Sequence, residues 1–277
     1  MVQVGESCSG DAGNSGVEMN EQPDLRLGRW QDVMQDVECS TLICDCPYST
    51  TTHDGHDIAA RATRNTIGYT KSDGITRIAP ASRETIDYKA WTPADVDAFV
   101  DFWAPRTRGW MVSLTDDILL PAWKAAMARH NRVTFQDVPA IISGMTVRLC
   151  GDGPSSWAIH IVVSRPRTAE FAKWGTLDGG YFGPSEEQFV AGGKPVWLMR
   201  ELVKAYSRVG DVVCDPTMGG GTTILAAMLE NRRSIGCELD AATFAMAKAR
   251  IADRGRTRPA MYSAKRKTNP NQSLIDL

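Results

Sequence analysis

The chain has 277 residues, of which 43% are apolar and 23% are charged. This length and composition suit one large soluble α/β domain and exceed what a minimal module needs. The longest apolar stretch, Trp157–Val163, is far too short to cross a membrane. Seven scattered cysteines, and an N-terminus without a basic segment followed by an apolar core, favour a cytoplasmic protein without a disulfide framework.

The net charge of -2 is unevenly distributed along the chain. Residues 1–24 carry five acids and no Lys or Arg, and their Gly- and Ser-rich composition predicts a disordered acidic leader. Residues 248–267 hold eight basic side chains against one acid, which suits either phosphate binding or a solvated tail. Residues 266–277 are expected to form a loose C-terminal tail, so the folded domain is expected over residues 25–265.

Short apolar segments alternate with segments of helical period along the middle of the chain. The predicted strands are Ser40–Cys44, Trp110–Leu114, Val133–Ile142, Trp157–Val163, Asp211–Cys214 and Ser234–Cys237. The predicted helices are Pro93–Phe102, Ile118–Ala128, Pro195–Tyr206, Thr222–Leu229 and Ala241–Ile251. Most strands are apolar on both faces, which is typical of the centre of a parallel sheet, and the alternation favours a doubly wound α/β sheet with helices on both faces.

Two long segments, Ser49–Ala90 and Arg165–Gly192, show no clear period. Irregular segments of this length in a compact domain are more often functional than neutral.

The first strand runs into Asp45-Cys46-Pro47-Tyr48. Ligands of open α/β sheets bind at the carboxyl ends of the strands, so Asp45 and Tyr48 are expected to project into such a crevice. An exocyclic amino group is a poor nucleophile because its lone pair is delocalised into the ring. A carboxylate and a backbone carbonyl that accept its two N–H bonds would favour the reactive form, and a tyrosine ring offers the base a stacking face.

A second strand runs into Asp215, a glycine cluster at Gly219–Gly221 and a helix expected to open near Thr222. Glycines there let the backbone turn tightly and approach a ligand closely. The following strand ends at Glu238, where a carboxylate is placed to accept hydrogen bonds from ribose hydroxyls.

Several ligands could use such a turn. A phosphate-binding P-loop is disfavoured because Gly219–Thr223 contains no Lys, and Gly192–Pro195 lacks the Ser or Thr that should follow its Lys. A dinucleotide site requires a third glycine where this chain has Leu or Ile. S-adenosylmethionine remains, since its cationic sulfonium and ammonium groups suit the acid Asp215. The alternative is an ordinary tight turn of a Rossmann-like sheet.

Four elements together resemble the amino-directed DNA methyltransferases, which form N6-methyladenine or N4-methylcytosine. Asp45–Tyr48 is similar to that family's D-P-P-Y, and Asp215–Thr223 is similar to its D-P-F-x-G-S-G-T-T. Gly193–Pro195 resembles its Lys-Pro element, and Ile235–Asp240 resembles its G-I-E-I-D strand end. The catalytic tetrapeptide precedes the cofactor turn by about 170 residues, which is the circularly permuted order of the family's β class.

The resemblance implies a Rossmann-like S-adenosylmethionine-dependent methyltransferase sheet that methylates a base flipped out of double-stranded DNA, acting as a monomer or homodimer. It implies a catalytic group of Asp45, Cys46, Pro47 and Tyr48. It implies a cofactor site formed by Asp215, Pro216, Thr217, Gly219, Gly221, Thr222, Thr223, Glu238 and Lys194. Adenine is favoured because the family's adenine enzymes usually carry Asp at the first tetrapeptide position. The alternatives are an N4-cytosine enzyme, an RNA methyltransferase and a catalytically degenerate nucleic-acid-binding module.

The chain departs from the family pattern at three places. Cys46 replaces the first Pro of the tetrapeptide, which keeps the carbonyl but makes the backbone less rigid. Thr217 replaces a Phe beside the cofactor. The strand before the catalytic one reads Gly28-Arg29-Trp30 where the family usually has Gly-Asp, which suggests a differently built adenine side of the cofactor site.

Several other residues of the sequence have a less specific pattern, and their role is either structural or left undecided between two interpretations. The His53–Asp57 stretch is interpreted as a polar loop rather than a metal site, and Asp116 and Asp117 as helix-capping residues with a possible pocket role. Trp174 and Tyr181 suit either stacking at a flipped base or surface packing. Residues 49–90 and 165–192 are predicted to share DNA recognition, and because they offer little surface, the recognised sequence is expected to be short.

Overall fold

In the computed structural model, the described residues are 22–54, 69–70, 77–78, 88–143, 156–190 and 192–256. The acidic leader up to residue 21, most of the segment 49–90 and the predicted C-terminal tail lie outside them. None of the helices in the described ranges combines the length and apolar character that crossing a bilayer requires.

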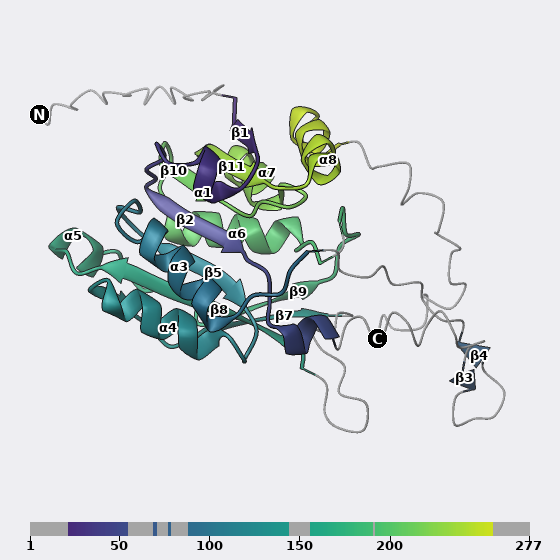
Figure 1. Cartoon of the computed structure of the whole chain (residues 1–277), viewed down its shortest axis with the longest axis horizontal. Helices are drawn as coiled ribbons and strands as arrows, with labels where there is room; N and C mark the ends of the chain where they lie inside the picture. The colour runs from purple at the N-terminus through teal and green to yellow at the C-terminus, as the bar shows by residue number, and fades with distance from the viewer. Residues whose placement is uncertain are drawn as a thin grey trace, which may run out of the picture.

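One large mixed sheet forms the centre of the molecule (Figure 1). Its strands are β1 (Asp24–Leu27), β2 (Thr41–Asp45), β5 (Met111–Thr115), β6 (Arg132–Thr134), β7 (Val138–Ser143), β8 (Ala158–Pro166), β9 (Tyr181–Pro184), β10 (Val212–Asp215) and β11 (Arg233–Glu238). The strand order is β1-β11-β10-β2-β5-β8-β7-β9, and β6 pairs with β8. Two short strands, β3 (Tyr69–Thr70) and β4 (Arg77–Ile78), form a separate antiparallel pair.

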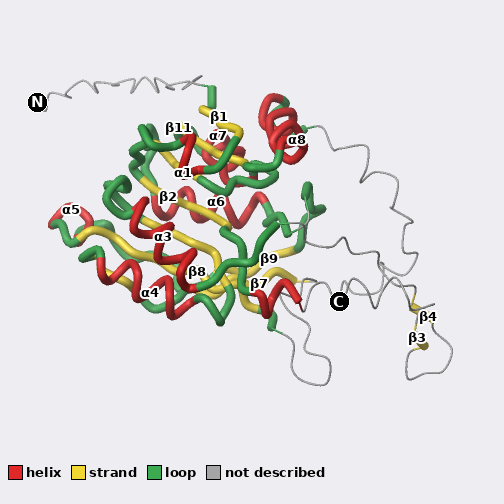
Figure 2. Tube along the Cα trace, in the orientation of Figure 1, coloured by secondary structure: helices red, strands yellow, loops and turns green. Residues whose placement is uncertain are grey.

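Helices cover both faces of this sheet, as the alternating pattern predicts (Figures 1 and 2). They are α1 (Trp30–Val33), α3 (Pro93–Trp103), α4 (Leu120–Arg129), α5 (Ala169–Ala172), α6 (Val196–Tyr206), α7 (Thr222–Leu229) and α8 (Ala241–Ala252). On one face, Leu42 of β2 packs with Trp103 of α3 and Trp123 of α4. On the other, Ile43 packs with Leu202 of α6 and Ala226 of α7, because successive strand residues point to opposite faces.

The sheet is only partly parallel, which corrects the sequence-based expectation. Strands β1, β11, β10, β2 and β5 run parallel, whereas β8 is antiparallel to β5, β6 and β7. Burial of both faces is the same for either direction of a central strand, so the apolar pattern of Trp157–Val163 could not distinguish them.

The single strand predicted at Val133–Ile142 is two strands, β6 and β7. Both pair with β8, but Val133 lies opposite Arg165 whereas Val138 lies opposite Ile161, so the register shifts by one residue between them. This shift is the geometry of a β-bulge. The segment Arg165–Gly192 is likewise not irregular throughout, since it contains the end of β8, the short helix α5 and strand β9.

Candidate active site

Three carboxylates end three neighbouring strands at one edge of the sheet. Asp45 ends β2, Asp215 ends β10 and Glu238 ends β11, and β10 pairs with both of the other strands. The structure therefore brings together the two strand ends that the sequence singled out. Burial, helped by the nearby charges of Asp45 and Glu238 and opposed by hydrogen bonds from Thr223 and Thr217, raises the pKa of Asp215 to about 7.

The catalytic candidate Asp45 is held by a lysine from a distant part of the chain. Lys194 Nζ lies 2.7 Å from Asp45 Oδ2, donates a second bond of 2.9 Å to the Gly192 carbonyl, and stands 5.0 Å from the centre of the Tyr48 ring. The Lys194 side chain is only 8% exposed, so this contact is largely shielded from solvent. Lys194 was predicted in the cofactor site, and in the structure its ammonium group contacts the carboxylate of Asp45.

The second oxygen of Asp45 is the open position of this site. Asp45 Oδ1 is buried and has no hydrogen-bond partner among the described residues, and the same holds for the Tyr48 hydroxyl. A buried acceptor without a partner is costly unless a ligand satisfies it. The arrangement therefore suits a ligand that donates an N–H or O–H bond beside the Tyr48 ring.

The glycine turn between β10 and α7 adopts the backbone that its glycines permit. Gly219 and Gly221 have φ of 50° and 73°, and Gly221 is the N-cap residue directly before α7. From α8, the buried Arg250 donates 2.9 Å bonds to the Gly220 carbonyl and to Thr222 Oγ1. Arg250 belongs to the cationic C-terminal segment, and its burial withdraws it from any phosphate-binding surface.

Glu238 fastens the same turn from the neighbouring strand. Its Oε2 accepts a 3.0 Å bond from the Gly219 amide, and its Oε1 accepts a 2.8 Å bond from the Asp240 amide. Burial raises the pKa of Glu238, although these amides lower it in part. Each carboxylate oxygen has two acceptor positions, so both retain capacity for a further donor.

The two glycines of this turn should respond differently to alanine. A Cβ added at Gly221 would lie 2.8 Å from Ile251 Cδ1, whereas one added at Gly219 would meet nothing within 4 Å. Both changes incur left-handed backbone strain of about 1–2 kcal/mol. We expect Gly221→Ala to cost a further 1–2 kcal/mol or so from overpacking, measured as a loss in free energy of unfolding in urea. Equal losses in the two variants would contradict this packing.

Two departures from the family pattern meet in this site. Cys46 Sγ lies 3.6 Å from Thr217 Oγ1 and 3.4 Å from Cys44 Sγ, and the Cys46 side chain is buried. The residue that replaces a Pro thus packs against the one that replaces a Phe. The contact between Cys46 and Thr217 joins the end of β2 to the glycine turn, and it leaves the Cys46 thiol buried.

The chain directly after strand β1 contacts the end of β11 through its backbone. The Gly28 amide donates a 2.9 Å bond to the Glu238 carbonyl. Arg29 is exposed, and Trp30 packs edge-on against Phe99 and Phe102, on the α3 side of the sheet. These contacts anchor β1 beside β11, the strand that ends at Glu238.

Sequence reasoning missed Tyr88, which lies near Asp45. The Tyr88 ring packs edge-on against His53, with 5.2 Å between the ring centres, and a Cβ added at Gly192 would lie 3.4 Å from its hydroxyl. Partial burial, together with the charges of Asp45 and Glu238, raises the pKa of Tyr88, although 49% of the residue stays exposed. Tyr88 belongs to no motif, so no local signal could have identified it.

Two other aromatic candidates lie elsewhere. Trp174 stacks on Phe171 and donates a 2.9 Å bond to the Ala205 carbonyl, near the end of α6 opposite to Lys194. Tyr181 is buried in the core of the α6 face. Packing therefore accounts for both, and neither joins the catalytic group.

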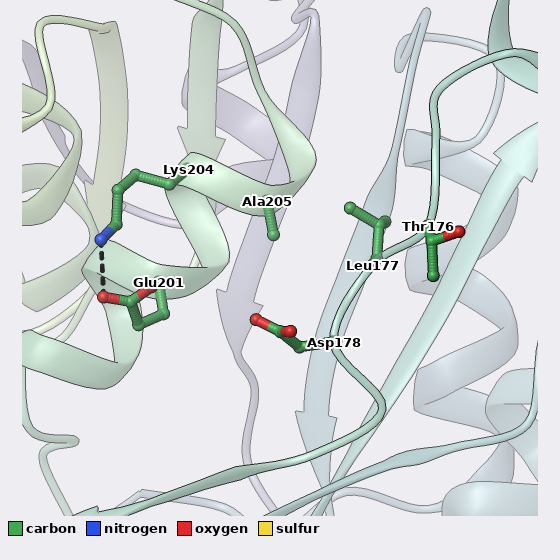
Figure 3. A pocket seen from close by; sticks show the side chains of 6 residues that line it. All are labelled: Thr176, Leu177, Asp178, Glu201, Lys204 and Ala205. Carbon is green, nitrogen blue, oxygen red and sulfur yellow. Dashed lines mark hydrogen bonds and ion pairs between the residues drawn. The ribbon is translucent and has the colours of Figure 1, made fainter.

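A cavity of about 250 Å³ opens beside the same end of α6 (Figure 3). Thr176, Leu177 and Asp178 line it from one side and Glu201, Lys204 and Ala205 from the other. Lys204 and Glu201 form a 2.6 Å ion pair at its wall. None of the predicted site residues lines this cavity, so it is separate from the candidate active site.

Parts of the amino-acid sequence are similar to known enzymes. Residues 156–249 match the sequence model of the DNA methylase family. A segment of 46 residues is 46% identical to the Type II methyltransferase M.MjaI of Methanocaldococcus jannaschii, covering 17% of this chain and 15% of that enzyme. Over the same length, 50% identity is found with the Type II methyltransferase M.MthZI of Methanothermobacter thermautotrophicus, covering 17% of this chain and 13% of that enzyme. The matches thus span only a small share of either relative.

Solved structures share the fold over most of the chain. The crystal structure of the M1.HpyAVI–SAM complex superposes with a TM-score of 0.57 at 14% identity, covering 83% of this chain and 99% of that one. The PvuII DNA methyltransferase, described as cytosine-N4-specific, superposes with a TM-score of 0.51 at 12% identity, covering 85% and 92%. At such low identity the likeness establishes the fold, and it confirms the predicted Rossmann-like sheet.

Proposed function

We propose that the protein transfers a methyl group from S-adenosylmethionine to an exocyclic amino group of a DNA base, starting from the match of residues 156–249 to the sequence model of the DNA methylase family. The observation that carries the proposal is the buried Asp45 Oδ1, which has no partner among the described residues and stands one strand away from the glycine turn. A carboxylate in this position accepts an N–H bond from an amino group that enters the site.

The residues fit the donor of the methyl group by charge. S-adenosylmethionine supplies an electrophilic methyl on a cationic sulfonium. Asp215 at the end of β10 is a buried acid that such a cation would stabilise in its ionised form. The turn around Gly219 and Gly221 brings backbone close to the ligand, and Glu238 offers acceptor positions to ribose hydroxyls.

The chemistry then rests on the residues that follow β2. Asp45 Oδ1 and the Cys46 carbonyl accept the two N–H bonds of the target amino group, which draws its lone pair out of the ring. The nitrogen would then form its bond to the methyl group as the bond from that methyl to sulfur breaks, which leaves S-adenosylhomocysteine, and the extra proton on the nitrogen would pass to the Asp45 carboxylate that already accepts its N–H. The Tyr48 ring stacks on the extruded base. Lys194 neutralises the charge on Asp45 from the Oδ2 side and leaves Oδ1 to the substrate.

We propose adenine as the target, because Asp45 has the residue type that the resembling adenine enzymes usually carry at this position. N4-cytosine methylation is the alternative, since the solved relatives include a cytosine-N4-specific enzyme. The protein should be incubated with long double-stranded DNA and S-adenosylmethionine, and the digested nucleosides analysed by mass spectrometry. N6-methyladenine is the expected product, N4-methylcytosine would select the alternative, and no methylated DNA nucleoside would overturn the function.

Residues 49–90 and 165–192 remain our candidates for DNA recognition. Within the second segment, Val190 and Phe189 lie over the glycine turn, because a Cβ added at Gly220 would meet them at 3.1 and 3.4 Å. The end of this segment thus covers the glycine turn, and because Trp174 and Tyr181 are taken up by packing, only its other residues are left to reach DNA. Such limited surface supports a short recognised sequence.

Removing the Glu238 carboxylate should weaken cofactor binding. Glu238→Ala deletes the acceptor proposed for the ribose and also releases the Gly219 amide. Loss of charge-assisted hydrogen bonds of this kind is worth roughly 1.5–3 kcal/mol, so the affinity for S-adenosylmethionine should fall about tenfold or more in titration calorimetry. Glu238→Gln, which retains one acceptor oxygen, should lose less. Unchanged affinity in a folded Glu238→Ala protein would remove this residue from the site.

A further inference from the structure

A buried acid from the neighbouring strand holds the chain that follows the catalytic tetrapeptide. Asp116 lies one residue beyond β5 and is only 2% exposed. Its Oδ2 accepts three bonds, from the Ser49 amide at 2.9 Å, the Ser49 hydroxyl at 2.5 Å and the Thr52 hydroxyl at 2.6 Å. All three donors come from the four residues directly after Tyr48.

Asp116 also has the capping role that its position suggests. Its Oδ1 accepts a 3.0 Å bond from the Leu119 amide, at the entry to α4. Burial alone would raise the pKa of Asp116, but the bonds from Ser49, Thr52 and Leu119 lower it by more, so the pKa lies below its ordinary value. The carboxylate is therefore ionised when it holds both segments, and capping explains only one of its oxygens.

The opposite side of the same segment is fixed by Trp91. Its amide donates a 2.9 Å bond to the Tyr48 carbonyl, and its ring stacks on Trp123 of α4 with 6.1 Å between the ring centres. The backbone of Tyr48 and Ser49 is thus held between the tip of β5 and the aromatic core under α3 and α4.

This double anchoring matters because position 46 is Cys. A Pro at this position would lock φ near −65° and stiffen the backbone whose carbonyl is proposed to accept the target N–H. Cys46 leaves that dihedral free, and its side-chain hydrogen bonds within the described residues go to Cys44 and Thr217. Lys194 holds Asp45 at the start of the tetrapeptide, and the bonds made directly after Tyr48 restrain its other end.

We propose that Asp116 is a positioning residue for methyl transfer, holding Cys46–Tyr48 in the reactive geometry that a Pro at position 46 would otherwise help to fix. This inference rests on the proposed function and names a residue that acts through its neighbours, since Asp116 contacts Ser49 and Thr52 rather than the substrate. A misplacement of about 1 Å can cost on the order of 10²-fold in rate, so a loss of this restraint should be visible in turnover.

The test is a rescue experiment on the full chain. Four donors bond to the two carboxylate oxygens of Asp116, and Asp116→Asn keeps only one acceptor oxygen for them. Because the tetrapeptide is then held less firmly, we expect the single-turnover rate of DNA methylation to fall about 10- to 100-fold. Its dissociation constant for S-adenosylmethionine should stay within about twofold of wild type, because the glycine turn is untouched. Adding Cys46→Pro to Asp116→Asn should restore at least half of the lost rate on a logarithmic scale. Asp117→Asn, the same charge change at the exposed neighbouring residue, is the matched control and should keep the wild-type rate.

Other outcomes would overturn the inference in distinguishable ways. A wild-type rate in folded Asp116→Asn, or a loss that Cys46→Pro leaves unrepaired, would show that Asp116 does not position the tetrapeptide. If Asp116→Asn fails to fold, Thr52→Val serves instead, since it removes one 2.6 Å bond and keeps the side-chain shape. Thr52→Val should then lower the rate severalfold without changing cofactor affinity, and an unchanged rate would contradict the inference. An inactive wild-type protein would instead contradict the proposed function.

Discussion

Replacing Asp45 with alanine should lower the rate of methyl transfer by about 10²–10⁴-fold, the range typical of losing a positioned acid–base group. The reason is structural: Asp45 Oδ1 is buried, has no partner among the described residues, and lies beside the Tyr48 ring at the carboxyl end of β2. The rate should be measured in single turnovers, with the tritiated methyl group counted on DNA.

The alanine variant also removes the partner of Lys194, which is 8% exposed. An unpaired buried charge destabilises a protein, so a loss of activity could reflect unfolding. Asp45→Asn is the matched variant, because its amide oxygen still accepts from Lys194 while the charge is lost. Both variants should bind S-adenosylmethionine nearly as tightly as wild type in calorimetry. Near-normal turnover in either folded variant would exclude the amino-methylation mechanism.

The affinity for S-adenosylmethionine should depend steeply on pH because of Asp215. Burial raises the pKa of Asp215 to about 7, so in the free protein at pH 6 the carboxyl is mainly protonated. A cationic ligand favours the ionised form, and binding then releases a proton. The affinity should therefore increase by up to about tenfold for each unit by which the pH is raised toward 7, and it should level off above pH 7. Titrations between pH 5.5 and 8 in buffers of different ionisation enthalpy would measure both the affinity and the released proton.

The same shift predicts a pH dependence of stability with a definite sign. Between pH values of about 4 and 7, Asp215 is protonated in the folded state and ionised in the unfolded state. The unfolded state then binds fewer protons, so the free energy of unfolding falls as pH rises, by roughly 1.4 kcal/mol per pH unit. Asp215→Asn keeps the acceptor for the Thr217 amide and should lose this slope relative to wild type. Parallel profiles in wild type and variant would show that Asp215 has an ordinary pKa.

The local patterns of the sequence determined much of this architecture. The helices over Pro93–Phe102 and Thr222–Leu229 lie where their period predicts, and α3 begins with a capping box of Thr92 and Asp95. The glycine turn and the strand-ending acids Asp45, Asp215 and Glu238 could be predicted for the same reason. Tight turns need glycine and buried strands need apolar residues within a few positions, so the sequence carries both signals locally.

The contacts between distant segments were decided by the tertiary structure alone. Lys194 reaches Asp45 across 149 residues, Asp116 reaches Ser49 across 67, and Cys46 meets Thr217 across 171. Such pairs depend on strand order, on register and on the side from which each segment arrives. The one-residue shift between β6 and β7 and the reversed direction of β8 depend on the same choices. Apolar periodicity records that a residue is buried but not what it is buried against, and for that reason the sequence could place the acids of this site but not the partners that hold them.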